Sequence, residues 1–413
     1  MKRIIKACLS IVLLILTGCV NKIENENSVK GILYTDQSPV AIEIADGKIQ
    51  KIVKIKALSD KDKNIFIAPG LIDNQVNGYM AVSFSFSGGD ELTMEGIKKA
   101  TMALWQAGVT TYLPTLTTNS REILLKNFAI LARAKENPDL HGSIPGFHLE
   151  GPYISPEDGY RGAHPARYVR KPDWEEFMEL YEASGENIIQ VTLAPEMEGA
   201  MEMITRLHDM GIVVALGHHN ASAEIITEAI DKGARIATHL GNGCANMIHR
   251  HVNPLWPQLS DDRLMISIIG DGFHLRPEEI RVFYKVKGPE KTVITSDVTH
   301  FAGLPAGEYI TPKGDKVELT PEGMIMYPAQ NVLYGSASPI IKGVGNVMKV
   351  TGCALKQAIQ MASTNPALLY NFNDRGEIKT GKRADLILFT VDDSKINIVK
   401  TIVEGEVVYQ TEK

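Results

Sequence analysis

Cysteine is scarce in this sequence: four residues occur among 413, and Cys8 and Cys19 stand near the N-terminus. Cys244 and Cys353 do not amount to a disulfide framework, whether they pair in an oxidising compartment or remain ordinary thiols. The fold must therefore depend on an apolar core. A content of 44% hydrophobic and 22% charged residues is typical of a globular protein that can build one.

Runs of basic residues are absent as well. Lys and Arg total 43 against 49 Asp and Glu, which gives a net charge of −6. No segment is rich enough in Lys and Arg to follow a phosphate backbone, so we expect no nucleic-acid partner. Neither GxGxxG after the first strand nor GxxxxGK[ST] occurs, which counts against the nucleotide-binding α/β folds.

The N-terminus carries the features of a secretory signal. Lys2, Arg3 and Lys6 precede an apolar run over 7–16, and Leu16-Thr17-Gly18-Cys19 resembles the bacterial lipobox. We therefore expect residues 1–18 to be a lipoprotein signal peptide, Cys19 to carry lipid and 19–28 to be a tether. The protein would then be extracytoplasmic and lipid-anchored to a bacterial membrane, in the periplasm or on the cell surface. A plain secretion signal and an uncleaved anchor are the alternatives.

Both ends of the chain beyond the tether are rich in short β-prone runs. Residues 29–64 contain three of them, separated by turn signals such as Asp46-Gly47, and residues 381–413 show the same texture. We expect the two segments to form one small β-sandwich domain around a central domain over 65–380.

The central domain alternates short apolar strands with helix-like segments. Repeated strand, helix, strand order indicates parallel pairing, and eight such units predict a TIM-like (β/α)₈ barrel of the α/β class, with an open doubly wound sheet as the alternative. The eight predicted strands are 65–72, 110–114, 144–149, 188–194, 212–216, 235–238, 264–269 and 292–295.

Polar side chains gather where these strands end. Nine of the eleven histidines lie at or just beyond a strand end, which is where barrel enzymes build their sites. Glu150, His218 and His239 come from different strands and would give three ligands to one divalent metal, with a position left open for water. Their chemistry suits Zn²⁺, and also Fe²⁺, Co²⁺ or Mn²⁺.

Three further residues at the same end are candidates for chemistry. Asp297 ends the last strand and is placed to act as general base and then general acid toward a water nucleophile, although it could instead cap a helix. His164 and His274 could polarise a carbonyl or hold a substrate.

Several motifs resemble those of one enzyme family. His148-Leu149-Glu150-Gly151-Pro152 and Leu193-Ala194-Pro195-Glu196 are specific to it, whereas Pro69-Gly70-Leu71-Ile72-Asp73 and Ala384-Asp385-Leu386 are shared across its superfamily. From about residue 29 to the C-terminus the chain resembles the N-acetylglucosamine-6-phosphate deacetylases of the amidohydrolase superfamily.

The resemblance implies hydrolysis of N-acetylglucosamine 6-phosphate to glucosamine 6-phosphate and acetate. It assigns the metal to Glu150, His218 and His239 and the acid/base role to Asp297. Gln75 and Asn77 stand where many amidohydrolases have His-x-His for a second metal, so a single metal is expected. The implied substrate contacts, including an arginine that crosses a homodimer interface, are Ala163, His164, Asn242, Gly243, Arg250, His274, Leu333, Tyr334 and Gly335.

The segment expected at the phosphate end departs from the family pattern. Here Gly241-Asn242-Gly243-Cys244 follows the metal-ligand strand, and Arg250 precedes His251-Val252-Asn253-Pro254. An unphosphorylated N-acetylhexosamine or another N-acyl compound is therefore the alternative substrate. A surface lipoprotein that only binds sugars is a further alternative, and loss of a metal ligand or of Asp297 would favour it.

Overall fold

The structure is a computed structural model that describes residues 28–85, 91–311, 314, 316–328 and 332–412. The predicted signal peptide over 1–18, Cys19 and all of the predicted tether but Ser28 lie outside these residues. Within the described part of the chain, no helix combines the length and the apolar character needed to span a membrane.

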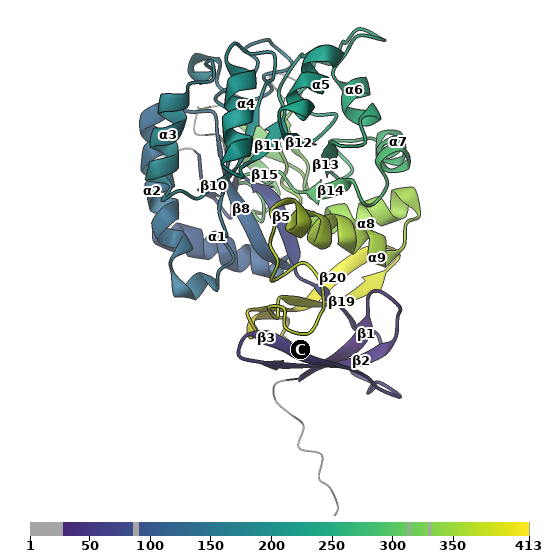
Figure 1. Cartoon of the computed structure of the whole chain (residues 1–413). Coiled ribbons are helices and arrows are strands. Elements are labelled where there is room, and N and C mark those ends of the chain that lie inside the picture. The colour runs from purple at the N-terminus through teal and green to yellow at the C-terminus, as the bar shows by residue number, and fades with distance from the viewer. Residues whose placement is uncertain (1–27, 86–90, 312–313, 315, 329–331, 413) are drawn as a thin grey trace, which may run out of the picture.

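A barrel of eight parallel strands forms the centre of the molecule (Figure 1). Each strand pairs with its neighbours in chain order, which confirms the predicted (β/α)₈ architecture. The strands are β5 (Leu71–Val76), β8 (Val109–Thr117), β9 (Phe147–Glu150), β10 (Ile188–Leu193), β11 (Val213–Leu216), β12 (Ala234–Ala237), β13 (Met265–Ile269) and β14 (Thr292–Thr295).

Helices between the strands bury their apolar faces against the outside of the barrel (Figure 1). Several begin at the residue that the sequence provides as a cap: Thr93, Ser120, Asp173 and Ser222 each accept a hydrogen bond from a backbone N–H of the first turn. The helices are α1 (Met94–Gln106), α2 (Arg121–Lys135), α3 (Trp174–Ala183), α4 (Ala200–Asp209), α5 (Ala223–Asp231), α6 (Leu255–Ser260), α7 (Pro277–Lys287), α8 (Ile340–Thr351), α9 (Leu355–Ile359) and α10 (Asn365–Leu369), with short 3₁₀ turns at Pro138–Leu140 and Ala166–Tyr168 and a π-helix at Gln360–Thr364.

As predicted, the two chain ends form one small β domain, which is a single seven-stranded sheet. Its order is β21-β20-β19-β4-β1-β2-β3. The sheet is continuous because β4 pairs in parallel with β1 and antiparallel with β19. Its strands are β1 (Ser28–Leu33), β2 (Pro39–Ala45), β3 (Lys48–Lys54), β4 (Phe66–Pro69), β19 (Leu386–Asp392), β20 (Lys395–Val403) and β21 (Glu406–Gln410).

The first barrel strand therefore starts later than expected. The apolar run 65–72 is divided at Gly70, where the chain passes from β4 of the end sheet into β5 of the barrel. A Cβ at this position would lie 2.1 Å from Thr110 Oγ1, so only glycine fits there.

A small antiparallel sheet follows the last barrel strand, and no such element was predicted. It consists of β15 (Gly307–Ile310), β16 (Lys316–Leu319), β17 (Ile325–Tyr327) and β18 (Val332–Leu333). The chain returns to the barrel at Ser336, whose N–H bonds to Asp297 O. A short hairpin, β6 (Gly78–Tyr79) and β7 (Val82–Ser83), is joined to the same region, since Ala81 N–H donates to His300 O. Both elements stand at the barrel end that carries Asp297.

The barrel closes at a seam between its first and last strands. There Val76 and Val298 form an isolated parallel bridge. Asp73 completes the closure, because its Oδ1 accepts hydrogen bonds from Thr295 Oγ1 and Ser296 N, each at 3.1 Å. Burial raises the pKa of Asp73 to about 6 despite these bonds.

The Asp73→Asn variant is expected to be more stable than the wild type at pH 7–8. Because the pKa of Asp73 is higher in the folded than in the unfolded chain, its stabilising contribution is present at pH 3 and is lost as the pH rises through about 6. A difference of about 2 pKa units corresponds to about 3 kcal/mol. Denaturant unfolding at pH 8 and pH 4 measures the difference in free energy of unfolding between the variant and the wild type. This difference should be smaller at pH 4 than at pH 8. A variant that is equally destabilised at both pH values contradicts the expectation.

Candidate active site

Three side chains from separate strands meet at the carboxyl end of the barrel. Glu150 ends β9, and His218 and His239 stand two residues beyond β11 and β12. Glu150 Oε1 lies 3.1 Å from His239 Nε2 and 3.4 Å from His218 Nε2, and the two Nε2 atoms are 3.2 Å apart. All three side chains are buried, so the predicted ligand set converges on one point.

The spacing and the charge of this group fit a metal ion. Donor atoms held at about 2.1 Å by one tetrahedral ion lie about 3.4 Å apart. Burial alone would raise the pKa of Glu150, but hydrogen bonds from His218 and His239 hold it well below its usual range. His218 Nδ1 lies 2.9 Å from Tyr160 O and donates its N–H to that carbonyl, which orients the ring with Nε2 toward Glu150.

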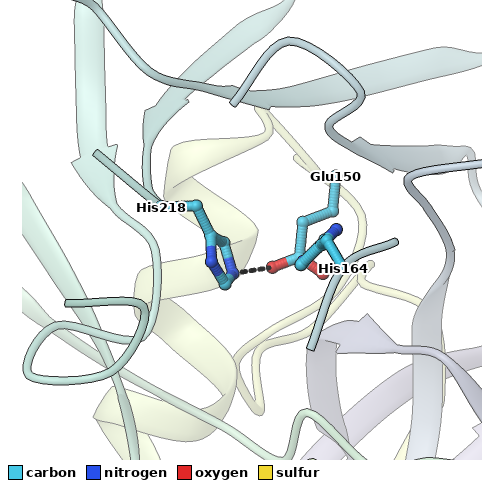
Figure 2. A group of neighbouring side chains, drawn as sticks. All are labelled: Glu150, His164 and His218. Atoms are coloured by element: carbon cyan, nitrogen blue, oxygen red, sulfur yellow. Dashed lines mark ion pairs between the residues drawn. The ribbon is translucent and has the colours of Figure 1, made fainter. Parts of the chain in front are cut away.

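His164 lies beside the same group. Glu150, His164 and His218 point toward one another in Figure 2, with ligand atoms within 4.8 Å of each other. Two overlapping sets of three ligands thus share Glu150 and His218. The spacing of 3.1–3.4 Å, which fits one tetrahedral ion, favours His239 as the third ligand. His164 is then left next to the ion and oriented by Thr118 Oγ1, which lies 2.8 Å from its Nδ1.

The backbone at the strand ends is held in an uncommon conformation. His218, His239 and Asp297 have φ of 55°, 29° and 51°, in or near the left-handed region that non-glycine residues rarely adopt. Such conformations persist where the surroundings over-determine them, and they cluster at functional sites. The three turns aim the side chains inward over the barrel mouth.

Two amide side chains bond to Asp297, and one of them also reaches Glu150. Gln75 Nε2 donates to Glu150 Oε1 at 2.8 Å and to Asp297 Oδ1 at 2.9 Å. Asn77 Nδ2 donates to the same Asp297 oxygen at 2.7 Å. Burial, and next the nearby Glu150 carboxylate, raise the pKa of Asp297 to about 6. A carboxyl group whose pKa lies near neutrality is suited to acid/base catalysis.

Sequence reasoning treated Gln75 and Asn77 only as the absence of a second metal site, and missed this contact. The amide side chains of Gln75 and Asn77 could have indicated this contact. A side-chain amide carries two N–H donors, which is what two adjacent buried carboxylates require.

Replacing Gln75 with Leu is expected to lower kcat about 10–100-fold, because the two carboxylates lose their shared donor and the orientation of Asp297 is released. Metal content should stay near the wild-type value, since none of the three ligands is changed. Steady-state kinetics and metal analysis measure both quantities. Activity within twofold of the wild type contradicts the positioning role of Gln75.

Comparisons with known proteins show which family the chain belongs to. The amidohydrolase family profile matches residues 66–408. The chain is 34% identical over 358 residues to N-acetylglucosamine-6-phosphate deacetylase of Bos taurus, with 84% of each chain covered. It is 29% identical to N-acetylgalactosamine-6-phosphate deacetylase of Escherichia coli O157:H7, over 88% of this chain and 93% of that one.

A crystal structure of N-acetylglucosamine-6-phosphate deacetylase from Thermotoga maritima superposes with a TM-score of 0.80 at 30% identity, covering 92% of this chain and 99% of that one. The chain belongs to the N-acetylglucosamine-6-phosphate deacetylase family. It is thus an amide-cleaving hydrolase of the metal-dependent amidohydrolase superfamily, and it has a buried Glu/His/His group that could hold a metal ion.

Most of the residues that we expected to contact the substrate lie around Glu150, His218 and His239. A Cβ on Gly243 would lie 2.9 Å from His218 Nδ1, and Asn242 N–H donates to His239 O at 2.9 Å. The Asn242-Gly243 backbone therefore packs directly behind two of the ligands.

The Leu333-Tyr334-Gly335 segment ends the inserted sheet one residue before Ser336, whose N–H donates to Asp297 O. Ala163 precedes His164 and shares its loop. His274 Nδ1 lies 2.8 Å from Asp271 Oδ2, which fixes the orientation of the ring.

Arg250 and the two cysteines are placed differently. Arg250 lies on an exposed turn, where its carbonyl accepts a hydrogen bond from Trp256 Nε1 at 3.0 Å. Cys244 and Cys353 are both half-buried free thiols. The deacetylase site described so far is therefore built from the barrel mouth alone, with Arg250 outside it.

Proposed function

We propose that this protein hydrolyses N-acetylglucosamine 6-phosphate to glucosamine 6-phosphate and acetate. The observation that carries the proposal is the spacing of 3.1–3.4 Å among Glu150, His218 and His239, with Asp297 joined to Glu150 through Gln75. This arrangement occurs in a chain whose sequence and fold are similar to those of N-acetylglucosamine-6-phosphate deacetylases along most of its length.

A divalent metal held by Glu150, His218 and His239 would supply the positive charge that activates water at neutral pH and polarises a carbonyl. The three side chains are chemically suited to Zn²⁺, which we propose as the resident ion; Fe²⁺, Co²⁺ and Mn²⁺ accept the same donors.

Proton transfer in the reaction is the task of Asp297. Its carboxylate takes a proton from the attacking water as the water oxygen bonds to the acetyl carbon, and it returns that proton to the nitrogen as the C–N bond breaks. His164 donates a hydrogen bond to the acetyl carbonyl oxygen, where negative charge develops. The products are acetate and the free amine, and Asp297 regains its starting ionisation.

The substrate is tested by acetate release from purified protein lacking residues 1–19, after bound metal has been quantified. N-acetylglucosamine 6-phosphate, its galactosamine epimer and unphosphorylated N-acetylglucosamine are compared side by side. We expect the 6-phosphate of N-acetylglucosamine to have the highest kcat/KM. A preference for the epimer or for the unphosphorylated sugar would move the proposal to that substrate, and no turnover of any would favour a binding-only protein.

We also propose that the protein is a homodimer in which Arg250 reaches the phosphate bound by the partner subunit. Apolar side chains surround its turn in exposed positions: Met247 is 89% exposed, Val252 68% and Trp256 52%. A group of this kind on a globular protein marks an interaction surface, and a dimer would cover it.

Mixing two inactive variants, Arg250→Ala and Asp297→Asn, tests this arrangement. If Arg250 acts across the interface, each mixed dimer has one complete site, and random mixing should restore about a quarter of wild-type activity. Each variant alone serves as the control. No recovery after subunit exchange, or a monomer at micromolar concentration by light scattering, contradicts the proposal.

The lipid anchor is a proposal that rests on the Leu-Thr-Gly-Cys motif. Expression of the full chain in bacteria with radiolabelled palmitate should label the wild type and leave Cys19→Ser unlabelled and released from the membrane fraction. Equal labelling of both forms would exclude Cys19 as the lipidated residue.

A further inference from the structure

The family motif Leu193-Ala194-Pro195-Glu196 has no part in the chemistry described above. Its first residue ends β10, and Glu196 lies three residues beyond that strand. The Glu196 carboxylate points to a neighbouring strand end, because its Oε1 accepts a hydrogen bond from the backbone N–H of Asn220 at 2.6 Å. Asn220 is two residues after the metal ligand His218.

The turn that carries His218 needs acceptors for its backbone N–H groups. His218 adopts φ of 55°, so the chain leaves the regular barrel ladder at this point. Gly217 N–H still reaches Leu193 O at 3.2 Å, whereas Asn220 N–H has the Glu196 carboxylate and Ala221 N–H has the His219 ring at 3.3 Å. An unpaired N–H at such a turn would cost free energy, and a charged acceptor gives the stronger bond.

The same turn is held from its other side by the loop after β9. Ser155 N–H donates to His218 O at 2.9 Å, and Tyr160 O bonds to the His218 ring. The side chain of Asn220 donates through Nδ2 to Glu157 Oε2 at 3.0 Å. Among these contacts, Glu196 supplies the one side chain that comes from the segment after β10.

Burial of the Glu196 carboxylate is unfavourable in free energy. Burial raises its pKa, and its Oε2 finds no hydrogen-bond partner among the described residues. The favourable contact of this carboxylate is therefore the hydrogen bond that Oε1 accepts from Asn220 N–H.

We propose that Glu196 is a positioning residue for the metal site: its carboxylate accepts the Asn220 N–H, holds the His218 turn in its left-handed conformation and so keeps the His218 imidazole aligned with Glu150 and His239. This role deepens the proposed function and rests on it for the metal, but the backbone contact can be tested without metal.

The test compares Glu196→Ala, Glu196→Asp and Glu196→Gln. Alanine removes the acceptor, and aspartate keeps the charge but is one methylene too short to reach Asn220 N. Glutamine keeps an oxygen acceptor at the same distance. Glu198→Ala is the matched control, because Glu198 lies in the same loop and pairs with the exposed Lys171 instead.

Hydrogen exchange of residues 216–222 in metal-free protein is the first readout. We expect exchange at least about tenfold faster in the alanine and aspartate variants, and near wild-type rates in the glutamine variant and the control. The second readout is Zn²⁺ affinity by competition with a chromophoric chelator, which should fall about 10–100-fold in the same two variants.

Unchanged exchange in Glu196→Ala, or exchange in Glu196→Gln as fast as in Glu196→Ala, overturns the inference. Circular dichroism identifies a variant that does not fold; the aspartate and glutamine variants then carry the comparison. If the exchange pattern is as expected but the wild type releases no acetate from any substrate, the proposed function fails and the role of Glu196 at the turn stands.

Discussion

Replacing Asp297 with Asn is expected to lower kcat by about 10²–10⁴-fold, the range that a positioned acid/base group contributes. The amide cannot take a proton from water or return one to the leaving nitrogen. It keeps an oxygen that can accept the hydrogen bonds from Gln75 and Asn77, so the geometry of the site should survive. Acetate release measures the loss.

Metal analysis is the control for this variant. Asp297 is not one of the three expected ligands, Glu150, His218 and His239, whose ligand atoms lie 3.1–3.4 Å apart. The Asp297→Asn variant should therefore hold as much metal as the wild type. Wild-type turnover in this variant would remove Asp297 from the mechanism. Loss of metal together with activity would assign it to the ligand set instead.

Replacing His218 with Ala is expected to weaken metal binding by at least about 100-fold and to abolish turnover. Only Glu150 and His239 would remain of the convergent set, and two ligands hold a divalent ion far less tightly than three. Metal content after gel filtration and the rise in Tm on adding Zn²⁺ both report the affinity, because a ligand that binds only the folded chain stabilises it.

His249→Ala is the matched control for His218→Ala. His249 is an exposed histidine whose Nδ1 accepts the backbone N–H of Val252 at 2.9 Å, away from the three ligands. It should keep its metal and its Zn²⁺-dependent rise in Tm. If His218→Ala binds Zn²⁺ as tightly as the wild type, the ion is held by another set, of which Glu150 with His164 is the nearest alternative.

The barrel and the convergence of Glu150, His218 and His239 were predictable because they depend on local patterns. Each strand is a short apolar run, and several helices begin at a residue such as Ser120 or Asp173 that caps the first turn. Parallel strands then place their carboxyl ends at one mouth. Glu150, His218 and His239 follow from this rule alone, since each lies at or just beyond a strand end.

The features that sequence reasoning missed depend on contacts between distant parts of the chain. Gln75 and Asp297 are 222 residues apart, and only the closing seam of the barrel brings the amide to the carboxylate. The end sheet is continuous because β4 has partners from both chain ends, which no local pattern reveals. Short strands such as Ile325–Tyr327 form the inserted sheet through their pairing rather than through their own periodicity.

The central claim is metal-dependent deacetylation, and one reconstitution experiment tests it most directly. Protein lacking residues 1–27 is stripped with a chelator, and acetate release from N-acetylglucosamine 6-phosphate is followed before and after one equivalent of Zn²⁺, Fe²⁺, Co²⁺ or Mn²⁺ is returned. We predict no turnover by the stripped protein and recovery with at least one of the ions, with acetate and free amine formed in equal amounts. Full activity of the stripped protein, or no acetate with any ion, would contradict the account.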